Sequence, residues 1–417
     1  MPSLRDALML RLKPTNNSSH PKKAINPMTE PVAIAAATEI KPGRYPDLSA
    51  DDLLDQIFAQ LVGEFALKPQ DIGGLLVSPP GMASGAGADI FIHEELGERL
   101  GLKTAFAETL NAGGSTHGLM VQRATLAIRA GLTDSVLCIA AGTFPNVSGG
   151  GAEAIAKMVC HPEFDSLYGA YIPPLYAQAA TRHMHEFGTT REQMAKVAVS
   201  SRQWALKHAD ALMKKHGAIT VEDVLDSRPI ASPFNLLDCS VPCDGGGAVL
   251  VCSETYARRL CRQPAWVLGF GEAHEYFNIS QCRDLLNLGG CKAGARAYEM
   301  AGVTPSELDF LELYDSFSFN PILGVENLGI VPAGQGGLFW DEGRGTPSGD
   351  LPVNTYGGLM SFGHTGDASG MSMIVEAARQ IMRSAGDRQL DKTDLGLVHS
   401  YGGMMAEHSV LILGSSN

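Results

Sequence analysis

The same order of segments occurs twice along this chain, and this repetition constrains the fold more than any other feature. In the first half, the glycine-rich turn and apolar helix pattern NAGGSTHGLMVQRATLAIRAG is followed by the glycine run and strand pattern DGGGAVLVCS. In the second half, SFGHTGDASGMSMIVEAARQI and YGGMMAEHSVLILG have the same order. Two halves built alike predict a pseudo-two-fold arrangement, with a site where the two sets of loops converge.

Short β-branched runs alternate with helical patterns along the chain. Strands are predicted at residues 74–77, 136–140, 248–251, 265–269, 310–313 and 410–413, and helices at 51–65, 117–130, 292–301 and 370–384. This alternation is typical of an α/β protein whose mixed sheets are covered by helices. The sequence therefore predicts two duplicated mixed-sheet halves with layered helices.

A more helical block at about residues 142–233 interrupts the alternation and predicts an inserted covering domain that lies over the first half. Here Thr189 or Thr190 is expected to cap a helix. The predicted domains are 28–261, which contains the covering region, and 262–417. Residues 1–27 are expected to be a flexible extension before a start at Met28. A transit peptide is the alternative, because this stretch has five basic residues and a single acidic one.

Composition limits the classes of function. The chain has 417 residues, of which 45% are hydrophobic and 18% charged, and this predicts a soluble globular protein with an ample core. The net charge of -13 argues against binding to a nucleic-acid backbone, and no apolar run reaches the roughly 18 residues that span a bilayer. The 8 cysteines are scattered without a CxxC pair, so we expect reduced thiols in the cytoplasm and no metal site.

The segment SFGHTGDASG, residues 361–370, carries the strongest indication of chemistry. His364 lies between Gly363 and Gly366, and glycines let the backbone approach a ligand closely. The helix that follows directs its free N–H groups back toward the same place. A histidine held there is able to exchange a proton beside a developing oxyanion. A tight strand-to-helix turn with an incidental histidine is the alternative.

Four segments in order resemble the thiolase superfamily, most of all thiolases of the sterol-carrier-protein type and their Cys-less relatives. GHTGDASG is similar to the family's Gly-His-Pro-x-Gly-x-Ser-Gly motif, and ELYDSFS resembles its His-Asp-Cys-Phe-Ser or Asn-Glu-x-Phe loop. SPFNLLDCSVPCDGGGAVLV resembles the stretch that leads into the last strand of the first half, and HSYGGMMAEHSVLIL the C-terminal Cys-x-Gly-Gly loop. The resemblance implies a thiolase fold, a homodimer, a coenzyme A thioester as substrate and no covalently bound cofactor.

The resemblance also assigns site positions, and the chain departs from the family at two of them. A thiolase uses a nucleophilic Cys at the N-terminus of a buried helix, a His that activates it and a second Cys. The nucleophile position falls on Gly114, and the adjacent Ser115 is a candidate replacement. The second Cys position falls on Ser400, which is a candidate hydrogen-bond donor or a turn cap. Only His364 of the trio is retained, so the covalent acyl-enzyme route is not expected.

The remaining residues predict a non-covalent site. Tyr314 stands where the family has His or Asn, and its phenol is suited to hydrogen-bond an oxyanion or transfer a proton, with a packing role as the alternative. Asp315 is a candidate base or orienting group. Gly114, Gly363 and Gly402 belong to the loops that are expected to gather N–H donors.

Three functions remain open. The first is the making or breaking of a C–C bond on an acyl-CoA through an enolate. The retro-aldolases that this chain resembles do this with a small zinc-ribbon and OB-fold partner subunit. The second is an ordinary acyltransferase with Ser115 as nucleophile. The third is a catalytically silent acyl-CoA-binding or scaffold subunit.

Overall fold

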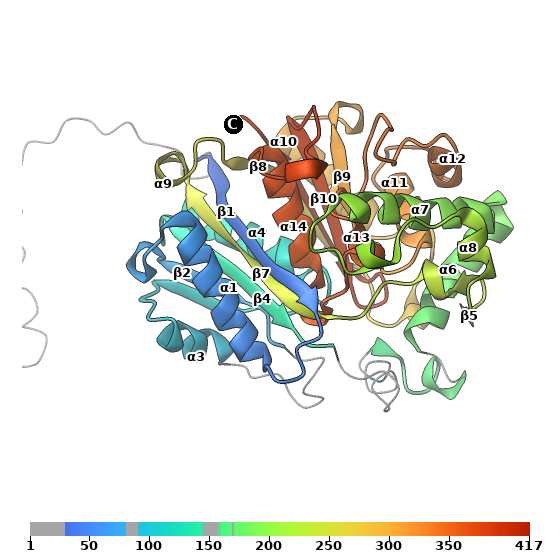
Figure 1. Ribbon diagram of the computed structural model, residues 1–417, viewed down its shortest axis with the longest axis horizontal. Helices are drawn as coiled ribbons and strands as arrows, with labels where there is room; N and C mark the ends of the chain where they lie inside the picture. Colours follow the sequence, from blue (N-terminus) through green and yellow to red (C-terminus); the bar gives the residue numbers. More distant parts are fainter. Residues whose placement is uncertain (1–29, 81–90, 145–156, 158, 169–170) are drawn as a thin grey trace, which may run out of the picture.

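The computed structural model describes residues 30–80, 91–144, 157, 159–168 and 171–417 (Figure 1). The predicted extension at residues 1–27 and part of the predicted covering region lie outside the described residues. A large sheet runs through the molecule, with helices in front of it and behind it (Figure 1). The chain is therefore the α/β protein that its alternating pattern predicts.

The strands of the large sheet follow the order β3-β2-β4-β7-β1-β8-β11-β10-β9. Their bounds are β1 Val32–Gly43, β2 Gly74–Val77, β3 Phe106–Thr109, β4 Ser135–Gly142, β7 Asp244–Ser253, β8 Ala265–His274, β9 Phe310–Leu313, β10 Leu395–Gly402 and β11 Glu407–Gly414. A separate ribbon pairs β5 (Pro229–Ala231) with β6 (Phe234–Asn235). Every residue of β4 and β7 is buried, as expected for strands that are covered on both faces.

The two halves of the sheet repeat one topology. In the first half, β2 pairs parallel with β4, β4 antiparallel with β7, and β7 antiparallel with β1. In the second half, β9 pairs parallel with β10, β10 antiparallel with β11, and β11 antiparallel with β8. The halves join edge to edge, through Ala33 with Trp266 and Ile34 with Ala265. The predicted duplication of mixed-sheet halves is confirmed, and their two inner edges are paired with each other into one sheet.

The central helices repeat in the same way. The helix bounds are α1 Ala50–Phe65, α3 Ile92–Arg99, α4 Thr116–Arg129, α6 Ile172–Phe187, α7 Arg191–Lys207, α8 Val221–Asp226, α9 Glu254–Leu260, α10 Gly290–Ala301, α11 Phe319–Asn327, α12 Gly336–Asp341, α13 Gly358–Ser361 and α14 Ser369–Ile381. Helix α4 precedes β4, helix α14 precedes β10, and the two helices pack against each other. In α14 all but one residue are buried, so the core holds this helix and its N-terminal end in place.

Helices α6, α7 and α8 come between β4 and β7 in the sequence, where the covering region is predicted. Thr190 caps α7, because its side chain accepts a hydrogen bond from the Gln193 N–H. Helix α7 packs on α11, α12 and α13, and its Lys196 forms an ion pair with Asp341 of α12. These partners belong to the second half, so the prediction that the region lies over the first half is wrong. The apolar face of a helix indicates that the helix packs on another element, but it does not indicate which element that is. The exact domain boundaries stay a prediction.

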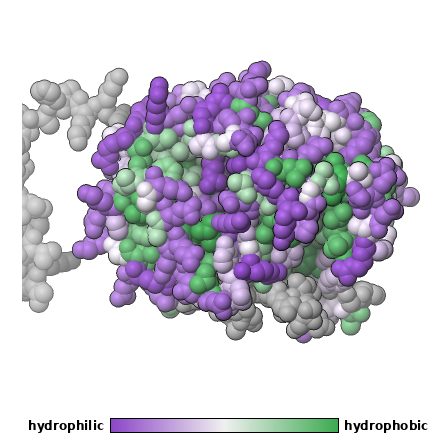
Figure 2. Space-filling view, in the orientation of Figure 1, coloured by the Kyte–Doolittle hydropathy of each residue, from purple (hydrophilic) through white to green (hydrophobic). Residues whose placement is uncertain are grey.

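The surface carries both hydrophilic and hydrophobic residues. Hydrophilic residues cover most of the face shown in Figure 2, and hydrophobic residues gather there in smaller patches. Within the part of the chain that the structure describes, no helix has the length and apolar character needed to cross a membrane.

Candidate active site

Three side chains from the second half of the chain meet in a hydrogen-bonded row. Tyr314 follows β9, His364 lies in the turn before α14, and Ser369 is the first residue of α14. The Tyr314 Oη lies 3.2 Å from His364 Nε2 and 2.9 Å from Ser369 Oγ. The Phe144 ring packs edge-on against His364, with ring centroids 5.6 Å apart. The structure thus brings together Tyr314 and His364, the two residues that the sequence placed at the centre of a site.

Backbone hydrogen bonds position both of these residues. The Tyr314 N–H donates to the His399 carbonyl at 3.0 Å, so Tyr314 extends the pairing of β9 with β10. The His364 N–H donates to the Val241 carbonyl at 2.7 Å, and the His364 carbonyl accepts from the Cys243 N–H at 2.9 Å. Both side chains are therefore attached to backbone that is paired with neighbouring segments, which limits their freedom.

Burial keeps both groups neutral near physiological pH. It lowers the pKa of His364 to about 4 and raises the pKa of Tyr314 to about 12. The Gly366 N–H donates to His364 Nδ1 at 3.2 Å, so the neutral ring carries its proton on Nε2 and donates it to the Tyr314 hydroxyl. The Tyr314 hydroxyl shares a further hydrogen bond with Ser369 Oγ, in which either oxygen is able to donate. Such a row is able to stabilise an oxyanion or to pass on a proton.

The ring of Tyr314 occupies the space beside Gly114, the position that the resemblance assigns to the nucleophile. A Cβ on residue 114 would lie 2.5 Å from Tyr314 Cε2 and 2.6 Å from Cζ. It would also lie 2.5 Å from the carbonyl oxygen of Tyr401, whose hydroxyl donates to the Tyr314 carbonyl at 3.0 Å. Close-packed interiors do not tolerate contacts this short. A side chain at residue 114 and this placement of Tyr314 therefore exclude each other.

Glycines allow the loops of the two halves to touch. Gly113 has a φ of 58°, and a Cβ there would lie 2.9 Å from the Cα of Gly402. A side chain on Gly402 would in turn collide with the Ala112 carbonyl oxygen. Gly363 has a φ of 146°, and its Cβ would lie 2.7 Å from Cys243 Sγ. The predicted glycine positions are thus places of close backbone approach, with little room for any larger residue.

The N-terminal ends of α4 and α14 meet beside the row. A side chain on Gly370 would collide with the Gly114 carbonyl oxygen and lie 2.8 Å from His117 Nδ1. Two helix N-termini side by side present free N–H groups and the positive ends of two dipoles, which favours a negatively charged ligand group. His117 is fully buried, and burial lowers its pKa to about 4. It is a neutral imidazole close to the backbone of Gly114 and Asp367.

Two of the other predicted site residues point away from the row. Ser115, at the start of α4, donates its hydroxyl proton to the Ala112 carbonyl at 2.7 Å. The Asp315 carboxylate accepts a hydrogen bond from the Leu359 N–H at 2.7 Å, at the start of α13. Burial raises the pKa of Asp315 to about 7. The Ser115 hydroxyl thus contacts a backbone carbonyl and not a base. Asp315 instead binds the backbone of the segment that leads to His364.

Ser400 is the fourth predicted position from a separate segment. It lies on β10, and its Oγ would be 3.6 Å from a Cβ on Gly118, which is one helical turn beyond Gly114. Among the described residues its hydroxyl has no hydrogen-bond partner. Ser400 therefore lies next to the site, under α4, and outside the row of Tyr314, His364 and Ser369.

Sequence reasoning did not assign a role to Ser369, although this residue lies in the same motif as His364. The available signal is its place at the first position of α14, directly after the glycine turn. The structure also adds Tyr401, which packs against Tyr314 with ring centroids 5.0 Å apart. In the described ranges, no group of three or more His, Cys, Asp or Glu side chains is arranged to hold a metal ion.

Comparison with known proteins assigns the family. The family model described as "Thiolase, N-terminal domain" matches residues 32–220, and the model described as "Thiolase C-terminal domain-like" matches residues 271–415. The acetyl-CoA acetyltransferase of Methanothermobacter thermautotrophicus is 32% identical over 378 residues, which cover 89% of this chain and 96% of that protein. The chain belongs to the thiolase superfamily, whose enzymes act on coenzyme A thioesters.

Two aldolases are also similar to this chain. The steroid side-chain-cleaving aldolase of Thermomonospora curvata is 30% identical over 372 residues, which cover 85% of this chain and 90% of that protein. A solved structure described as "Ltp2-ChsH2(DUF35) aldolase" superimposes with a TM-score of 0.78 at 27% identity, covering 93% of this chain and 98% of that chain. Relatives with the same fold are thus named for different activities. The fold therefore does not identify the reaction, which has to be inferred from the residues of the site.

Proposed function

We propose that this protein cleaves the C–C bond of a β-hydroxyacyl-CoA in a retro-aldol reaction, or forms that bond in reverse, without a covalent acyl-enzyme. The observation that carries the proposal is the ring of Tyr314, which stands where a nucleophilic side chain at residue 114 would have to be. A retro-aldol reaction needs proton transfer and a stabilised enolate, and it needs no nucleophile. The similarity to two aldolases supports the same chemistry.

The reaction balances with the substrate and a proton carrier. The O–H bond of the β-hydroxyl breaks, and its electron pair forms the carbonyl of the released aldehyde or ketone. The bond between the α- and β-carbons breaks, and its electron pair forms the enolate of the thioester. The α-carbon then gains a proton, so the net change is one proton moved from oxygen to carbon. A phenol that gives up one proton and takes up another stays neutral, which fits a Tyr314 whose pKa is raised to about 12.

Each residue of the row has a proposed part in this reaction. Tyr314 carries the proton between the β-hydroxyl oxygen and the α-carbon, with Ser369 Oγ 2.9 Å away as its hydrogen-bond partner. When the substrate is bound, His364 turns its Nε2–H from the Tyr314 hydroxyl to the oxygen of the enolate, beside the N-termini of α4 and α14. A neutral donor suits this part, since a proton that remains on the imidazole stabilises the oxyanion without being transferred.

A basic segment near His364 supports a coenzyme A thioester as the substrate. Lys214 and Lys215 are exposed on the short 3-10 helix Leu212–His216. The first residue of this helix donates its N–H to the Phe362 carbonyl at 3.1 Å, two residues before His364. In a chain with a net charge of -13, exposed lysines beside the site give the local positive potential that attracts phosphate groups.

Product release and protein mass together test the proposed chemistry. The purified protein is mixed with a panel of β-hydroxyacyl-CoA thioesters, and we expect release of an aldehyde or ketone. Intact-mass analysis after incubation with acetyl-CoA is expected to show no acetyl adduct. Ser115→Ala should leave both results unchanged, because the Ser115 hydroxyl is bonded to a backbone carbonyl.

Two outcomes would favour the other functions. An acetyl adduct that disappears in Ser115→Ala would establish an acyltransferase with a serine nucleophile. Binding of acyl-CoA without turnover of any substrate, alone or with a partner subunit, would establish a silent binding subunit.

We also propose that two copies of the chain associate through β3. Among the described residues this edge strand pairs with β2 alone. The opposite edge strand, β9, is covered, because Leu311 exchanges two backbone hydrogen bonds of 2.9 Å with Pro352 and Asn354. An open edge strand is a template for pairing with another chain. Light scattering at micromolar concentration should give twice the chain mass of 44.2 kDa, and a monomer would contradict the proposal.

A partner subunit and a cytoplasmic location stay predictions. The name "Ltp2-ChsH2(DUF35) aldolase" contains two components, and this supports a search for a second subunit here. The zinc-ribbon and OB-fold partner that the resemblance implies is the first candidate for co-purification.

A further inference from the structure

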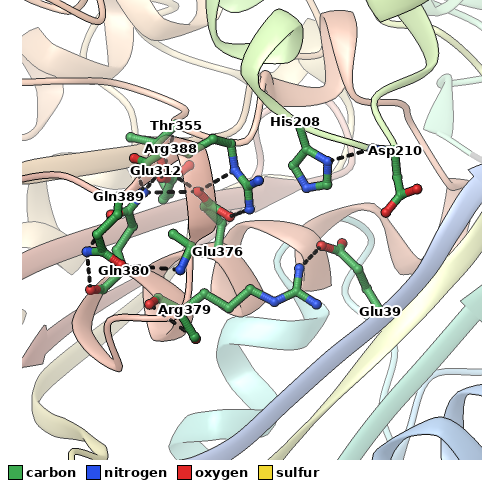
Figure 3. Close-up of polar contacts among 12 residues, drawn as sticks. Glu39, His208, Asp210, Glu312, Thr355, Glu376, Arg379, Gln380, Arg388 and Gln389 are labelled. Atoms are coloured by element: carbon green, nitrogen blue, oxygen red, sulfur yellow. Dashed lines mark hydrogen bonds and ion pairs between the residues drawn. The ribbon is translucent and has the colours of Figure 1, made fainter. Parts of the chain in front are cut away.

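Buried polar and charged groups gather around Glu312, Glu376 and Arg388 (Figure 3). Glu312 of β9 and Glu376 of α14 are both fully buried. Glu312 precedes Tyr314 by two residues, so the two side chains leave the strand on the same face. Glu376 follows Ser369 by about two helical turns. The cluster therefore joins the same strand and helix whose side chains meet in the active site.

Thr355 connects the two carboxyl groups. Its Oγ1 lies 2.9 Å from Glu312 Oε1 and 2.8 Å from Glu376 Oε1. The same oxygen accepts a hydrogen bond from Gln380 Nε2 at 3.1 Å. A threonine hydroxyl has one proton, so it donates to one of the two carboxyl oxygens and not to both. The second short contact requires a proton that comes from a carboxyl group.

The position of Arg388 decides which carboxyl group holds that proton (Figure 3). Arg388 donates to both oxygens of Glu376, from Nε at 3.1 Å and from Nη2 at 2.8 Å, so Glu376 is the anion. Glu312 makes no ion pair with any described residue, whereas Arg379 pairs with Glu39 at 2.6 Å. With Glu312 protonated, the cluster holds two cations and two anions. With Glu312 ionised, it would hold an unpaired buried charge, which is costly.

We infer that Glu312 is a neutral carboxylic acid that positions Tyr314. The Glu312 hydroxyl donates to Thr355 Oγ1, and Thr355 donates to Glu376, so the chain of hydrogen bonds fastens β9 to α14. This places the Tyr314 hydroxyl at its 2.9 Å distance from Ser369. The positioning role rests on the proposed function of Tyr314, whereas the protonation of Glu312 does not.

Infrared spectroscopy tests the protonation of Glu312 without any assay of activity. At neutral pH, the difference spectrum between the unchanged protein and Glu312→Gln is expected to contain the C=O stretching band of a protonated carboxylic acid. Asp244→Asn serves as the matched control, because it removes a different buried carboxyl group, one that accepts hydrogen bonds from Arg44 and from the Tyr45 and Phe144 N–H groups, and it should leave this band in place. A Glu312→Gln spectrum that differs only in carboxylate bands would overturn the inference.

Kinetics test the positioning of Tyr314. Glu312→Gln keeps a donor for Thr355 and is expected to keep most of kcat. Glu312→Leu removes the hydrogen bond and should lower kcat about tenfold or more with little change in KM, as misplaced catalytic groups do. In a Tyr314→Phe background, Glu312→Leu should cost nothing further, because its effect acts through the phenol.

The outcomes separate this inference from the proposed function. Equal losses of kcat in Glu312→Gln and Glu312→Leu would refute the positioning role. Losses of kcat that add up when Glu312→Leu is combined with Tyr314→Phe would refute it as well. Full activity of Tyr314→Phe by itself would refute the proposed function, and the infrared result would still decide the state of Glu312.

Discussion

Tyr314→Phe is expected to lower turnover of a β-hydroxyacyl-CoA by a factor on the order of 10² or more, and His364→Ala by a similar factor. Tyr314→Phe removes the hydroxyl that lies 3.2 Å from His364 Nε2 and 2.9 Å from Ser369 Oγ, and it leaves the ring in place. His364→Ala removes the neutral donor proposed for the enolate oxygen. Steady-state measurement of aldehyde or ketone release, with each variant checked for folding by circular dichroism, gives both factors.

Tyr298→Phe is the control for the loss of a hydrogen-bonded tyrosine hydroxyl, here on a half-buried side chain. The Tyr298 hydroxyl donates to the Leu328 carbonyl at 3.1 Å and belongs to α10, outside the row. We expect unchanged turnover and a loss of about 1 kcal/mol in the free energy of unfolding, the usual net worth of such a hydrogen bond. If Tyr314→Phe folds and turns over as fast as this control, the phenol does not carry the proton.

Gly114→Cys is expected to weaken the fold and the activity together. The new Cβ would lie 2.5 Å from Tyr314 Cε2, so the ring must move or the helix must shift. Overpacking of this kind costs about 1–3 kcal/mol in the free energy of unfolding, and the displaced phenol should lose its contacts with His364 and Ser369. Urea denaturation and the product-release assay measure the two losses.

Two further variants test whether steric overlap at residue 114 causes these losses of stability and activity. Gly63→Cys introduces the same thiol at an exposed helix position where a Cβ meets nothing within 4 Å, so stability should change by less than about 0.5 kcal/mol. In a Tyr314→Ala background, Gly114→Cys should cost less stability than in the unchanged protein, because the collision with the ring is gone while the close contact with the Tyr401 carbonyl oxygen remains. In this double variant the thiol stands at the N-terminus of α4, which favours the thiolate, and acetyl-CoA is expected to acetylate it. Undiminished stability of Gly114→Cys alone would contradict the close contact with Tyr314.

Local pattern predicted much of the fold. Strands β2 and β9 begin and end with their apolar runs, at residues 74–77 and 310–313. The pattern did not predict β1, whose sequence VAIAAATEIKPG is rich in alanine, a residue with little preference for strands. Pairing with β7 along most of its length makes this segment a strand, and that pairing joins residues about 200 positions apart. Long-range pairing of this kind leaves no local signal.

The candidate site was predictable where one short motif contained it. The glycine turn and the helix after it indicated His364, and the resemblance of ELYDSFS to a thiolase loop indicated Tyr314. Asp315 was expected beside them, but successive side chains leave an extended segment on opposite sides, and its carboxylate meets the Leu359 N–H instead. The contact of Thr355 with both Glu312 and Glu376 joins three segments, and no spacing in the sequence indicates it.

By itself, the sequence determined the duplicated order of strands and helices, the glycines of the converging loops and the glycine at residue 114. Only the tertiary structure decided that the Tyr314 ring fills the space beside Gly114, that α7 packs on the second half, and that Thr355 contacts both Glu312 and Glu376. The physical reason is that periodicity specifies which residues share one face of a helix or strand. The distance between side chains of different elements depends instead on how the whole core packs.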